Sequence, residues 1–322
     1  MKRTLLLTFA ATLLCAGAYA ADPELYCADL TYDGFTTRSY TFATRGDRTL
    51  VLEIDLPERG DAGGPRPFVV YVPGGSWRTC GIGAFRRQSA YLASQGIAGV
   101  RIVYSLVGDG ADFSAGLEEL QAARDLVAAR AGELGLDTLR FGYVAASAGT
   151  PLAADEALSQ AGCRFFVGYN GIYDLTRRID GSRFPEEGTP YLAPFSDGEL
   201  RDFSPVNRIG ADPPAVALFH GRADRTISWK QSQLFCDAVR AADRSLRRRP
   251  PRLLQLREVR LPRGGHPQDG GVHLLRVGRV DGASPAGVWL KGLADSVSPF
   301  RRPYGKVTRP ASAPFSSLHG GG

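Results

Sequence analysis

The residues around Ser147 form the pattern in this chain that most strongly suggests chemistry. The stretch "GYVAASAGT", residues 142–150, surrounds this serine with small and apolar residues. An apolar run precedes the serine and a helix-like segment follows it, which predicts a strand-to-helix turn too tight for bulky side chains. The pattern A-A-S-A-G puts Ala145 and Gly149 at the two glycine positions of the G-x-S-x-G nucleophile elbow. We therefore predict that Ser147 stands at the tip of this turn as a nucleophile.

A serine hydroxyl needs a base, and the base needs an orienting carboxylate. Asp224 follows the apolar run "AVALFHG", and His266 follows the last apolar run, "LLQLREVRL". Loops at the carboxyl ends of strands are where open α/β sheets build their sites, so we predict a triad of Ser147, Asp224 and His266. The alternatives are a helix-capping role for Asp224 and a turn role for His266. His273 is the reserve base, and His220 is expected to be structural.

Backbone donors for an oxyanion are the remaining requirement of such a site. "VYVPGGSWRTCG" follows an early apolar strand, and its Gly74-Gly75-Ser76 backbone can turn N–H groups inward. The amide of the residue after the nucleophile, Ala148, is the second expected donor. We predict that this loop and the amide of Ala148 supply the donors, the alternative for the loop being an ordinary Pro-Gly turn.

The elements that must position these residues follow from hydrophobic patterning. Residues 36–44 and 49–56 alternate like half-exposed antiparallel strands, joined by a turn. Later apolar runs are nearly continuous, as in parallel strands covered on both faces. Helical segments lie between them, which predicts an α/β fold with a mostly parallel central sheet and antiparallel N-terminal strands. The continuous runs are "PFVVYVPGG", "AGVRIVYSL", "LRFGYVAAS", "RFFVGYNG" and "AVALFHG".

Composition divides the chain into three parts. Residues 1–20 combine two basic residues, an apolar run and a final Ala-Tyr-Ala, which predicts a cleaved signal peptide and export to the periplasm or medium. The alternative is a membrane anchor, but the apolar run is short for one. Residues 21–300 are expected to form the catalytic domain. Within it, the polar, proline- and glycine-rich segment 174–212 is a predicted lid, and residues 301–322 are a predicted disordered tail.

Charge is distributed unevenly, although the formal net charge is +6. Residues 21–243 hold 22 basic and 29 acidic residues, whereas residues 244–322 hold 15 basic and 4 acidic. The acidic body argues against a nucleic-acid-binding fold. The basic end is interpreted as a solvated segment, the alternative being contact with an anionic surface.

Four cysteines remain after the expected cleavage, and an even number in an exported chain allows two disulfides. We predict the pairs Cys27–Cys80 and Cys163–Cys236, the first of which would stiffen the loop after Ser76. The alternative is four buried thiols. The spacing matches no zinc pattern, so no metal or other cofactor is expected.

With these motifs the chain resembles the α/β-hydrolase superfamily, in particular its small carboxylesterase and lipase-like group, which includes acetyl and feruloyl esterases. "VVYVPGGSW" is similar to the oxyanion loop, "VAASAGT" to the elbow, "FHGRADRTIS" to the acid loop and "LPRGGH" to the histidine loop. The resemblance implies a serine hydrolase that cleaves a small-molecule or carbohydrate-linked ester through an acyl-enzyme. It also implies that Gly75, Ser76 and Ala148 supply the oxyanion donors and that Trp77 packs beside the acyl pocket.

Two residues depart from the family pattern. Pro73 replaces the usual histidine of the oxyanion loop, and Ala145 replaces the first glycine of the elbow. These departures leave open a catalytically impaired, binding-only relative. An amidase or peptidase on the same fold is the other alternative, although peptidases of this type usually carry a large additional N-terminal domain.

Overall fold

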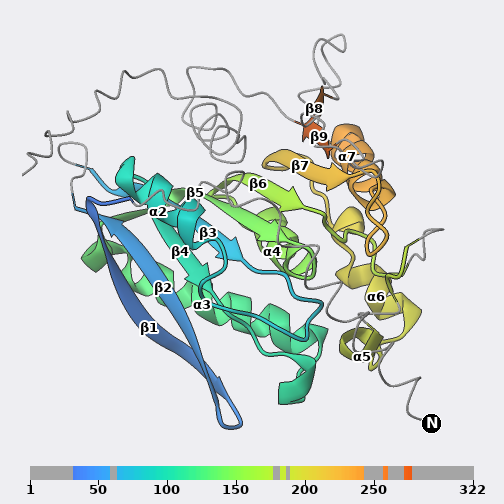
Figure 1. The fold of residues 1–322 in the computed structure, drawn as a ribbon, viewed down its shortest axis with the longest axis horizontal. Helices are drawn as coiled ribbons and strands as arrows, with labels where there is room; N and C mark the ends of the chain where they lie inside the picture. The colour runs from blue at the N-terminus through green and yellow to red at the C-terminus, as the bar shows by residue number, and fades with distance from the viewer. Residues whose placement is uncertain are drawn as a thin grey trace, which may run out of the picture. The chain divides into compact units, whose positions relative to one another are not determined.

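The computed structural model describes residues 32–58, 64–176, 182–185, 189–242, 257–259 and 272–277. Within these residues the strands form one sheet in the order β1-β2-β4-β3-β5-β6-β7-β9-β8 (Figure 1). The strand bounds are β1 (Phe35–Arg45), β2 (Arg48–Pro57), β3 (Arg66–Val72), β4 (Ala98–Ile102), β5 (Leu136–Ala146), β6 (Cys163–Tyr169), β7 (Ala215–Gly221), β8 (Arg257–Val259) and β9 (Val272–Val277). The helices are α2 (Arg86–Ser94), α3 (Phe113–Leu134), α4 (Gly149–Ser159), α5 (Thr189–Leu192), α6 (Asp197–Phe203) and α7 (Lys230–Ala242), with short 3-10 turns η2 (Val107–Asp109) and η4 (Pro205–Asn207).

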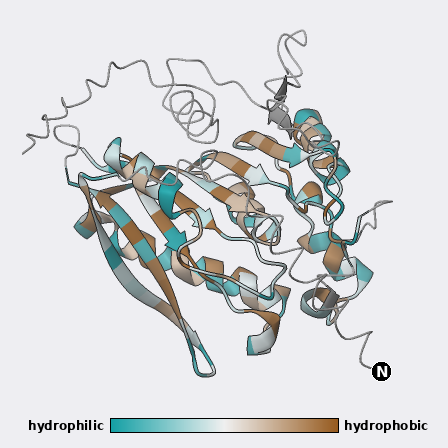
Figure 2. Cartoon of the chain, in the orientation of Figure 1, coloured by the Kyte–Doolittle hydropathy of each residue, from teal (hydrophilic) through white to brown (hydrophobic). Residues whose placement is uncertain are grey.

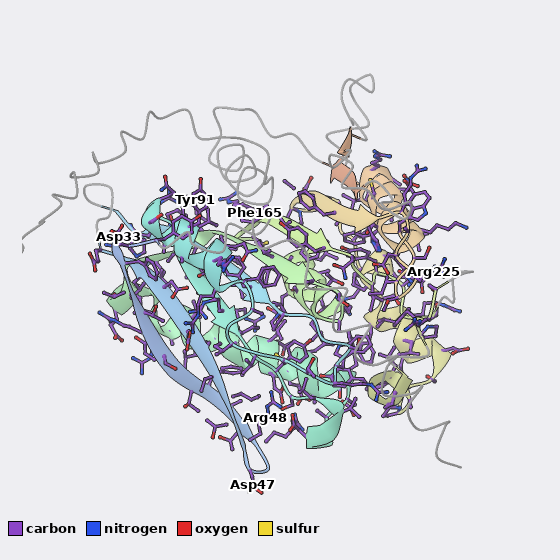
Figure 3. The ribbon with its side chains drawn as sticks, viewed as in Figure 1. Asp33, Asp47, Arg48, Tyr91, Phe165 and Arg225 are labelled. Atoms are coloured by element: carbon purple, nitrogen blue, oxygen red, sulfur yellow. The ribbon has the colours of Figure 1, made fainter. Side chains whose placement is uncertain are left out.

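The first two strands form the predicted antiparallel hairpin. β1 pairs with β2 along its length, with a register shift between Thr41 and Ala43. Hydrophilic and hydrophobic residues alternate along this hairpin, as Figure 2 shows, because one face of the ribbon packs on the protein and the other meets solvent. Arg48 lies at the tip of the hairpin, next to Asp47 (Figure 3). It forms an ion pair of 2.7 Å with Asp109, which ties the hairpin to η2.

The central strands β4, β3, β5, β6 and β7 run parallel, as predicted from their continuous apolar runs. Successive residues of β3 enter different clusters, because side chains alternate between the faces of a strand. Phe68 and Val70 pack with α3, α4 and α7 on one face, whereas Val69 and Tyr71 pack with Leu92 of α2 on the other. The carboxyl ends of β3, β5, β6 and β7 therefore meet along one edge.

The long helix α3 begins and ends as its sequence dictates. Asp112 caps its first turn by accepting a hydrogen bond of 3.0 Å from the amide of Ala115, and Gly135 ends it in the left-handed conformation. In contrast, α2 has no capping side chain at its start. Its N-cap position is Phe85, whose side chain caps nothing, so the sequence carries no start signal there. None of the helices among the described residues combines the length and apolar character of a membrane span.

The far edge of the sheet contains one antiparallel strand, β9, in addition to the predicted antiparallel strands at the N-terminal edge. β9 lies between β7 and β8 and is antiparallel to both. β8, which lies within the predicted last strand, consequently runs in the same direction as β7. Residues 260–271, which contain His266, connect β8 to β9 and lie outside the described residues.

A buried ionic cluster holds β2, β4 and α2 together. The Arg101 guanidinium contacts both carboxylate oxygens of Asp55, at 2.9 and 3.1 Å, and reaches Glu53 at 2.7 Å. Ser89 of α2 and Thr37 of β1 also donate hydrogen bonds to Asp55. Burial raises the pKa of Asp55, but the hydrogen bonds from Arg101, Ser89 and Thr37 outweigh it and hold the pKa below its usual value.

Candidate active site

The turn at Ser147 has the backbone of a nucleophile elbow. Ser147 joins the carboxyl end of β5 to the start of α4 and has a φ of 49°, a left-handed conformation that is strained for a residue with a side chain. Its amide donates a hydrogen bond of 2.9 Å to the Tyr169 carbonyl at the end of β6. Its own carbonyl accepts hydrogen bonds from the amide and hydroxyl of Thr150, at 2.9 and 2.6 Å. Neighbouring elements thus hold the strained residue in place from both sides.

Close packing explains the small residues around the serine. A side chain at Gly149 would collide with the carbonyl of Pro73, so only glycine fits where α4 begins. Ala145 is completely buried on β5, opposite Val72 and Gly168 of the flanking strands. An alanine is therefore accommodated at the first elbow position.

The loop after β3 lies directly against this turn. A Cβ atom built on Gly74 would lie 2.9 Å from the Ser147 Cβ, which puts the loop backbone next to the serine. Gly75 has a φ of 130°, and Ser76 and Trp77 both have a φ of 54°. A side chain at Gly75 would also collide with the Thr79 carbonyl, so this position requires glycine for two independent reasons. The loop is a tightly wound turn rather than an extended connection.

Hydrogen bonding within the loop leaves the expected oxyanion donors uncommitted. The Gly75 carbonyl accepts from the amides of Arg78 and Thr79, at 2.9 and 3.0 Å. Within the described part of the chain, the structure records no hydrogen bond donated by the amides of Gly75, Ser76 or Ala148. Unpaired amide donors beside a strained serine are the feature that an oxyanion site needs.

The two departures from the family pattern are compatible with this geometry. The Pro73 carbonyl accepts a hydrogen bond of 2.9 Å from the buried hydroxyl of Tyr104. Proline lacks an N–H, but Pro73 is not one of the expected donors. The loop is therefore anchored through the carbonyl of the very residue that departs from the pattern.

Trp77 connects the oxyanion loop to the excursion between β6 and β7. Its side chain is 1% exposed and stacks on Tyr191 of α5, with ring centroids 5.2 Å apart and planes 7° from parallel. The rings of Phe113 and Phe184 lie at 6.3 and 6.4 Å. Tyr191 in turn donates a hydrogen bond of 3.1 Å to the Ser105 carbonyl. The structure thus gives Trp77 a packing partner in the predicted lid segment.

The predicted lid segment, residues 174–212, is bound to the site region at further points. The amide of Arg183 donates a hydrogen bond of 2.9 Å to the carbonyl of Arg225, which is labelled in Figure 3. The amide of Phe184 donates one of 3.0 Å to the carbonyl of Thr226, in the same loop as Asp224. Gln231 of α7 accepts from the amide of Asp174 at 2.9 Å and donates to its carbonyl at the same distance. These contacts hold the first part of the excursion, at Asp174 and at Arg183 and Phe184, against the acid loop and α7.

Asp224 lies in the loop after β7, at the sheet edge where β5 also ends. One carboxylate oxygen accepts hydrogen bonds from the amides of Thr226 and Ile227, at 2.8 and 3.0 Å. The other lies 3.6 Å from Nε2 of His220, too far for a hydrogen bond. Burial raises the pKa of Asp224, but His220 and the two amides lower it more, so the net pKa is below its usual value and the side chain is ionised.

His220 is structural, as predicted. It is 1% exposed, and both ring nitrogens are engaged, Nδ1 with the Ser232 hydroxyl at 2.8 Å and Nε2 with the Ile227 carbonyl at 2.9 Å. Because a carbonyl only accepts, Nε2 carries a proton. His273 is on β9, opposite His220 in the strand register. His266 lies outside the described residues, so its place in the triad stays a prediction.

The predicted disulfide between Cys163 and Cys236 is not formed. Both residues are buried free thiols: Cys163 starts β6 and donates to the Phe165 carbonyl at 3.3 Å, whereas Cys236 is on α7. Cys80 is also a free thiol, and burial raises its pKa to about 11. Its predicted partner, Cys27, lies outside the described residues. The prediction failed because an even number of cysteines does not show which of them the fold brings together.

Several residues that support the site carried no sequence signal. Three such side chains form hydrogen bonds to segments far away in the sequence: Thr150 with Ile172, Tyr191 with Ser105, and Gln231 with Asp174. These partners are visible only in the fold. Thr150 is the one with a local hint, because it follows the elbow glycine directly. Among the described residues, the structure contains no group of three histidine, cysteine or acidic side chains arranged to hold a metal ion.

Comparison with known proteins shows which proteins this chain is similar to. Residues 52–174 match the family model BD-FAE, a stretch that contains the oxyanion loop and the elbow. Among curated proteins, the chain is similar to the probable carboxylic ester hydrolase LipM of Mycobacterium tuberculosis, at 28% identity over 56% of this chain and 46% of the relative. It is also similar to the isoprenylcysteine alpha-carbonyl methylesterase ICME of Arabidopsis thaliana, at 27% identity over 63% of this chain and 54% of the relative. The matched region thus amounts to about half of each of these relatives.

Solved structures show the same fold. Esterase 2 of Thermogutta terrifontis, phosphonylated by sarin, superposes with a TM-score of 0.57 at 22% identity, over 66% of this chain and 83% of that one. The same esterase with bound propionate gives a TM-score of 0.55 at 23% identity, over 65% and 79% of the two chains. The predicted class is confirmed: the chain has the α/β-hydrolase fold. Its relatives lie in the carboxylesterase group of that fold, and this is the group that the sequence motifs resemble.

Proposed function

We propose that the protein is a serine hydrolase that cleaves carboxylic esters, with Ser147 as the nucleophile. The observation that carries this proposal is the strained turn at Ser147, packed against a loop whose Gly75 and Ser76 amides donate no hydrogen bond within the described residues. The names of the curated relatives, which include a carboxylic ester hydrolase and a methylesterase, support the same reaction type.

The proposed reaction proceeds through an acyl-enzyme. His266 takes the proton from the Ser147 hydroxyl as its oxygen attacks the ester carbonyl, and Asp224 orients and stabilises the imidazolium that forms. The amides of Gly75 or Ser76 and of Ala148 bind the oxyanion. His266 then protonates the departing alcohol, and a water molecule activated by the same histidine releases the acid. Every step uses only protein groups and water.

The ionised state of Asp224 supports its assigned role. An acid that orients a histidine must carry charge at neutral pH, and the lowered pKa of Asp224 ensures this. Two backbone amides donate hydrogen bonds to one oxygen of Asp224, which fixes the direction of the carboxylate. Within the described residues, the other oxygen lies within hydrogen-bond distance of no donor. A fixed carboxylate with one available oxygen is what a partner histidine requires.

The proposed substrates are esters of small acids, either free or attached to carbohydrate. Structures of the Thermogutta terrifontis esterase hold propionate and butyrate, so short acyl chains are the first to test. The contacts between Trp77 and the excursion suggest that this segment limits the acyl side. We further propose that residues 1–20 direct export and are removed, which intact-mass measurement of the secreted protein tests directly.

Hydrolysis of p-nitrophenyl acetate, propionate and butyrate tests the proposal. Ser147→Ala should reduce kcat/KM by at least about a thousandfold, because it removes the nucleophile. Ser159→Ala is the matched control, since this exposed serine lies at the other end of the same helix, where its hydroxyl donates to the Glu156 carbonyl. Equal rates for the Ser147→Ala variant and the parent would overturn the proposal. If the folded wild-type protein cleaves amides but not esters, the amidase alternative is favoured. If it cleaves neither esters nor amides, the catalytically impaired, binding-only alternative is favoured.

A further inference from the structure

A cavity of about 120 Å³ lies between α3 and the central sheet. Its inner wall is apolar and comes from three adjacent strands and one helix, with Val70, Val100, Ile102 and Leu120 among its members. Arg124, Ala128, Thr138 and Gln160 also line it, and the exposure of Ala128 and Thr138 shows that this end reaches the surface. The cavity is therefore a blind pocket that solvent molecules can enter.

This pocket is separate from the candidate active site. None of the proposed catalytic or oxyanion residues lines it. On β5 its wall includes Phe141 and Tyr143, and Ser147 is four residues beyond, about 13 Å further along an extended strand. The pocket thus faces the middle of the sheet, whereas the active site lies at the carboxyl ends of the strands.

One wall of the pocket is aromatic. The rings of Phe68 and Phe141 stack with centroids 5.1 Å apart, and the ring of Tyr143 meets Phe141 edge-on at 6.0 Å. Aromatic rings favour an aromatic partner, which packs face or edge against them. Empty apolar cavities of comparable volume are known to bind benzene-sized molecules. Shape and lining therefore favour a single aromatic ring.

The polar groups at one end of the pocket are mutually neutralised. Arg124 contacts the buried Glu156 carboxylate at 3.2 Å, and the Tyr143 hydroxyl lies 3.4 Å from the same oxygen. Gln160 donates through Nε2 to the Tyr143 hydroxyl at 3.0 Å and also to Glu156. Within the described residues no hydrogen bond to the side-chain amide oxygen of Gln160 is recorded, so this oxygen remains as an acceptor. A charged ligand would find no compensating charge there, whereas one hydroxyl would find an acceptor.

We propose that this pocket is a second binding site, and that its ligand is a small uncharged aromatic alcohol of the phenol class. The ring fills the space beside Phe68, Phe141 and Tyr143, and the hydroxyl donates to Gln160. The proposal is independent of the reaction at Ser147, because no residue is shared between the two sites.

Phenol is the probe, and ligand-observed NMR of the full chain is the measurement. Saturable phenol binding is expected, with weaker binding of cyclohexanol, which lacks the ring, and none of benzoate, which carries a charge. The melting temperature should rise with phenol concentration, because the ligand binds the folded state. Absence of saturable phenol binding, or equal binding of benzoate, would overturn the proposal.

Two variants locate the bound phenol. Ala128→Phe blocks the pocket mouth from an exposed position, and its control, Ala129→Phe, makes the same change at an adjacent exposed position that does not line the pocket. Phenol binding should be lost in the first variant and retained in the second. Ala123→Leu, which fills the pocket from inside, should also abolish binding. Binding that survives Ala128→Phe would place phenol elsewhere, including the active site, and would refute the assignment.

Discussion

Replacement of Gly75 by alanine is the sharpest perturbation of the proposed oxyanion loop. At a φ of 130° a residue with a side chain is strained, and the new methyl group would overlap the Thr79 carbonyl. The conformation alone should lower the free energy of unfolding by about 1–3 kcal/mol. Relief of the overlap requires movement of the 75–79 turn, because the obstructing atom is backbone and cannot rotate away.

That movement should affect catalysis more than binding. The turn carries the amides of Gly75 and Ser76, and loss of one oxyanion donor lowers kcat by about a hundredfold to a thousandfold. Because the oxyanion forms only in the transition state, kcat should fall with little change in KM. Urea denaturation measures the stability, and initial rates on p-nitrophenyl butyrate separate the two kinetic constants.

Gly81→Ala is the matched control for this variant. Gly81 belongs to the same connection between β3 and α2, but a methyl group there meets no atom within 4 Å and its φ is not positive. The control should keep parental stability and rate. If Gly75→Ala were as stable and as active as Gly81→Ala, the described loop conformation and its role as donor would both be wrong.

Three further predictions follow from the buried contacts and the proposed base. Arg101→Met should lower the free energy of unfolding by about 3–5 kcal/mol in urea denaturation, because it leaves the Asp55 carboxylate buried without its counter-charge; parental stability would contradict this. The pKa of Asp55 is lower in the folded protein than in the unfolded chain, where it is about 3.9. The ionised Asp55 therefore stabilises the fold above that pH, and this stabilisation is lost as the pH falls through the folded-state pKa. Urea denaturation at a series of pH values measures this loss. The rate of ester hydrolysis should fall below about pH 6.5 as His266 protonates, if its pKa is that of a free histidine, and a flat pH–rate profile down to pH 5 would exclude a histidine base.

Much of the fold was predictable because its signals are local. The apolar runs of the central strands and the alternation in the β1–β2 hairpin reflect which faces are buried, and burial acts on each strand separately. The turn at Ser147 was predictable for a similar reason. It leaves no room for large side chains within two positions of the serine, so the sequence there contains only small residues.

The remaining features depend on contacts between distant segments. The stack of Trp77 on Tyr191 cannot be read from local composition. The two hydrogen bonds that Arg101 donates to the Asp55 carboxylate cannot be read from it either. β9 was missed because a short apolar run says nothing about which strand it pairs with or in which direction. The cysteine pairing was wrong for the same reason, since counting cysteines does not give their separation in the fold.

Covalent labelling of Ser147 tests the central claim most directly. A fluorophosphonate reacts only with an activated serine hydroxyl, and a structural relative is known in a form phosphonylated by sarin. Peptide mass spectrometry should find one adduct per chain, on Ser147, and His266→Ala should label far more slowly than the parent. An unlabelled parent, an adduct on another residue, or equal labelling rates with and without His266 would contradict the account.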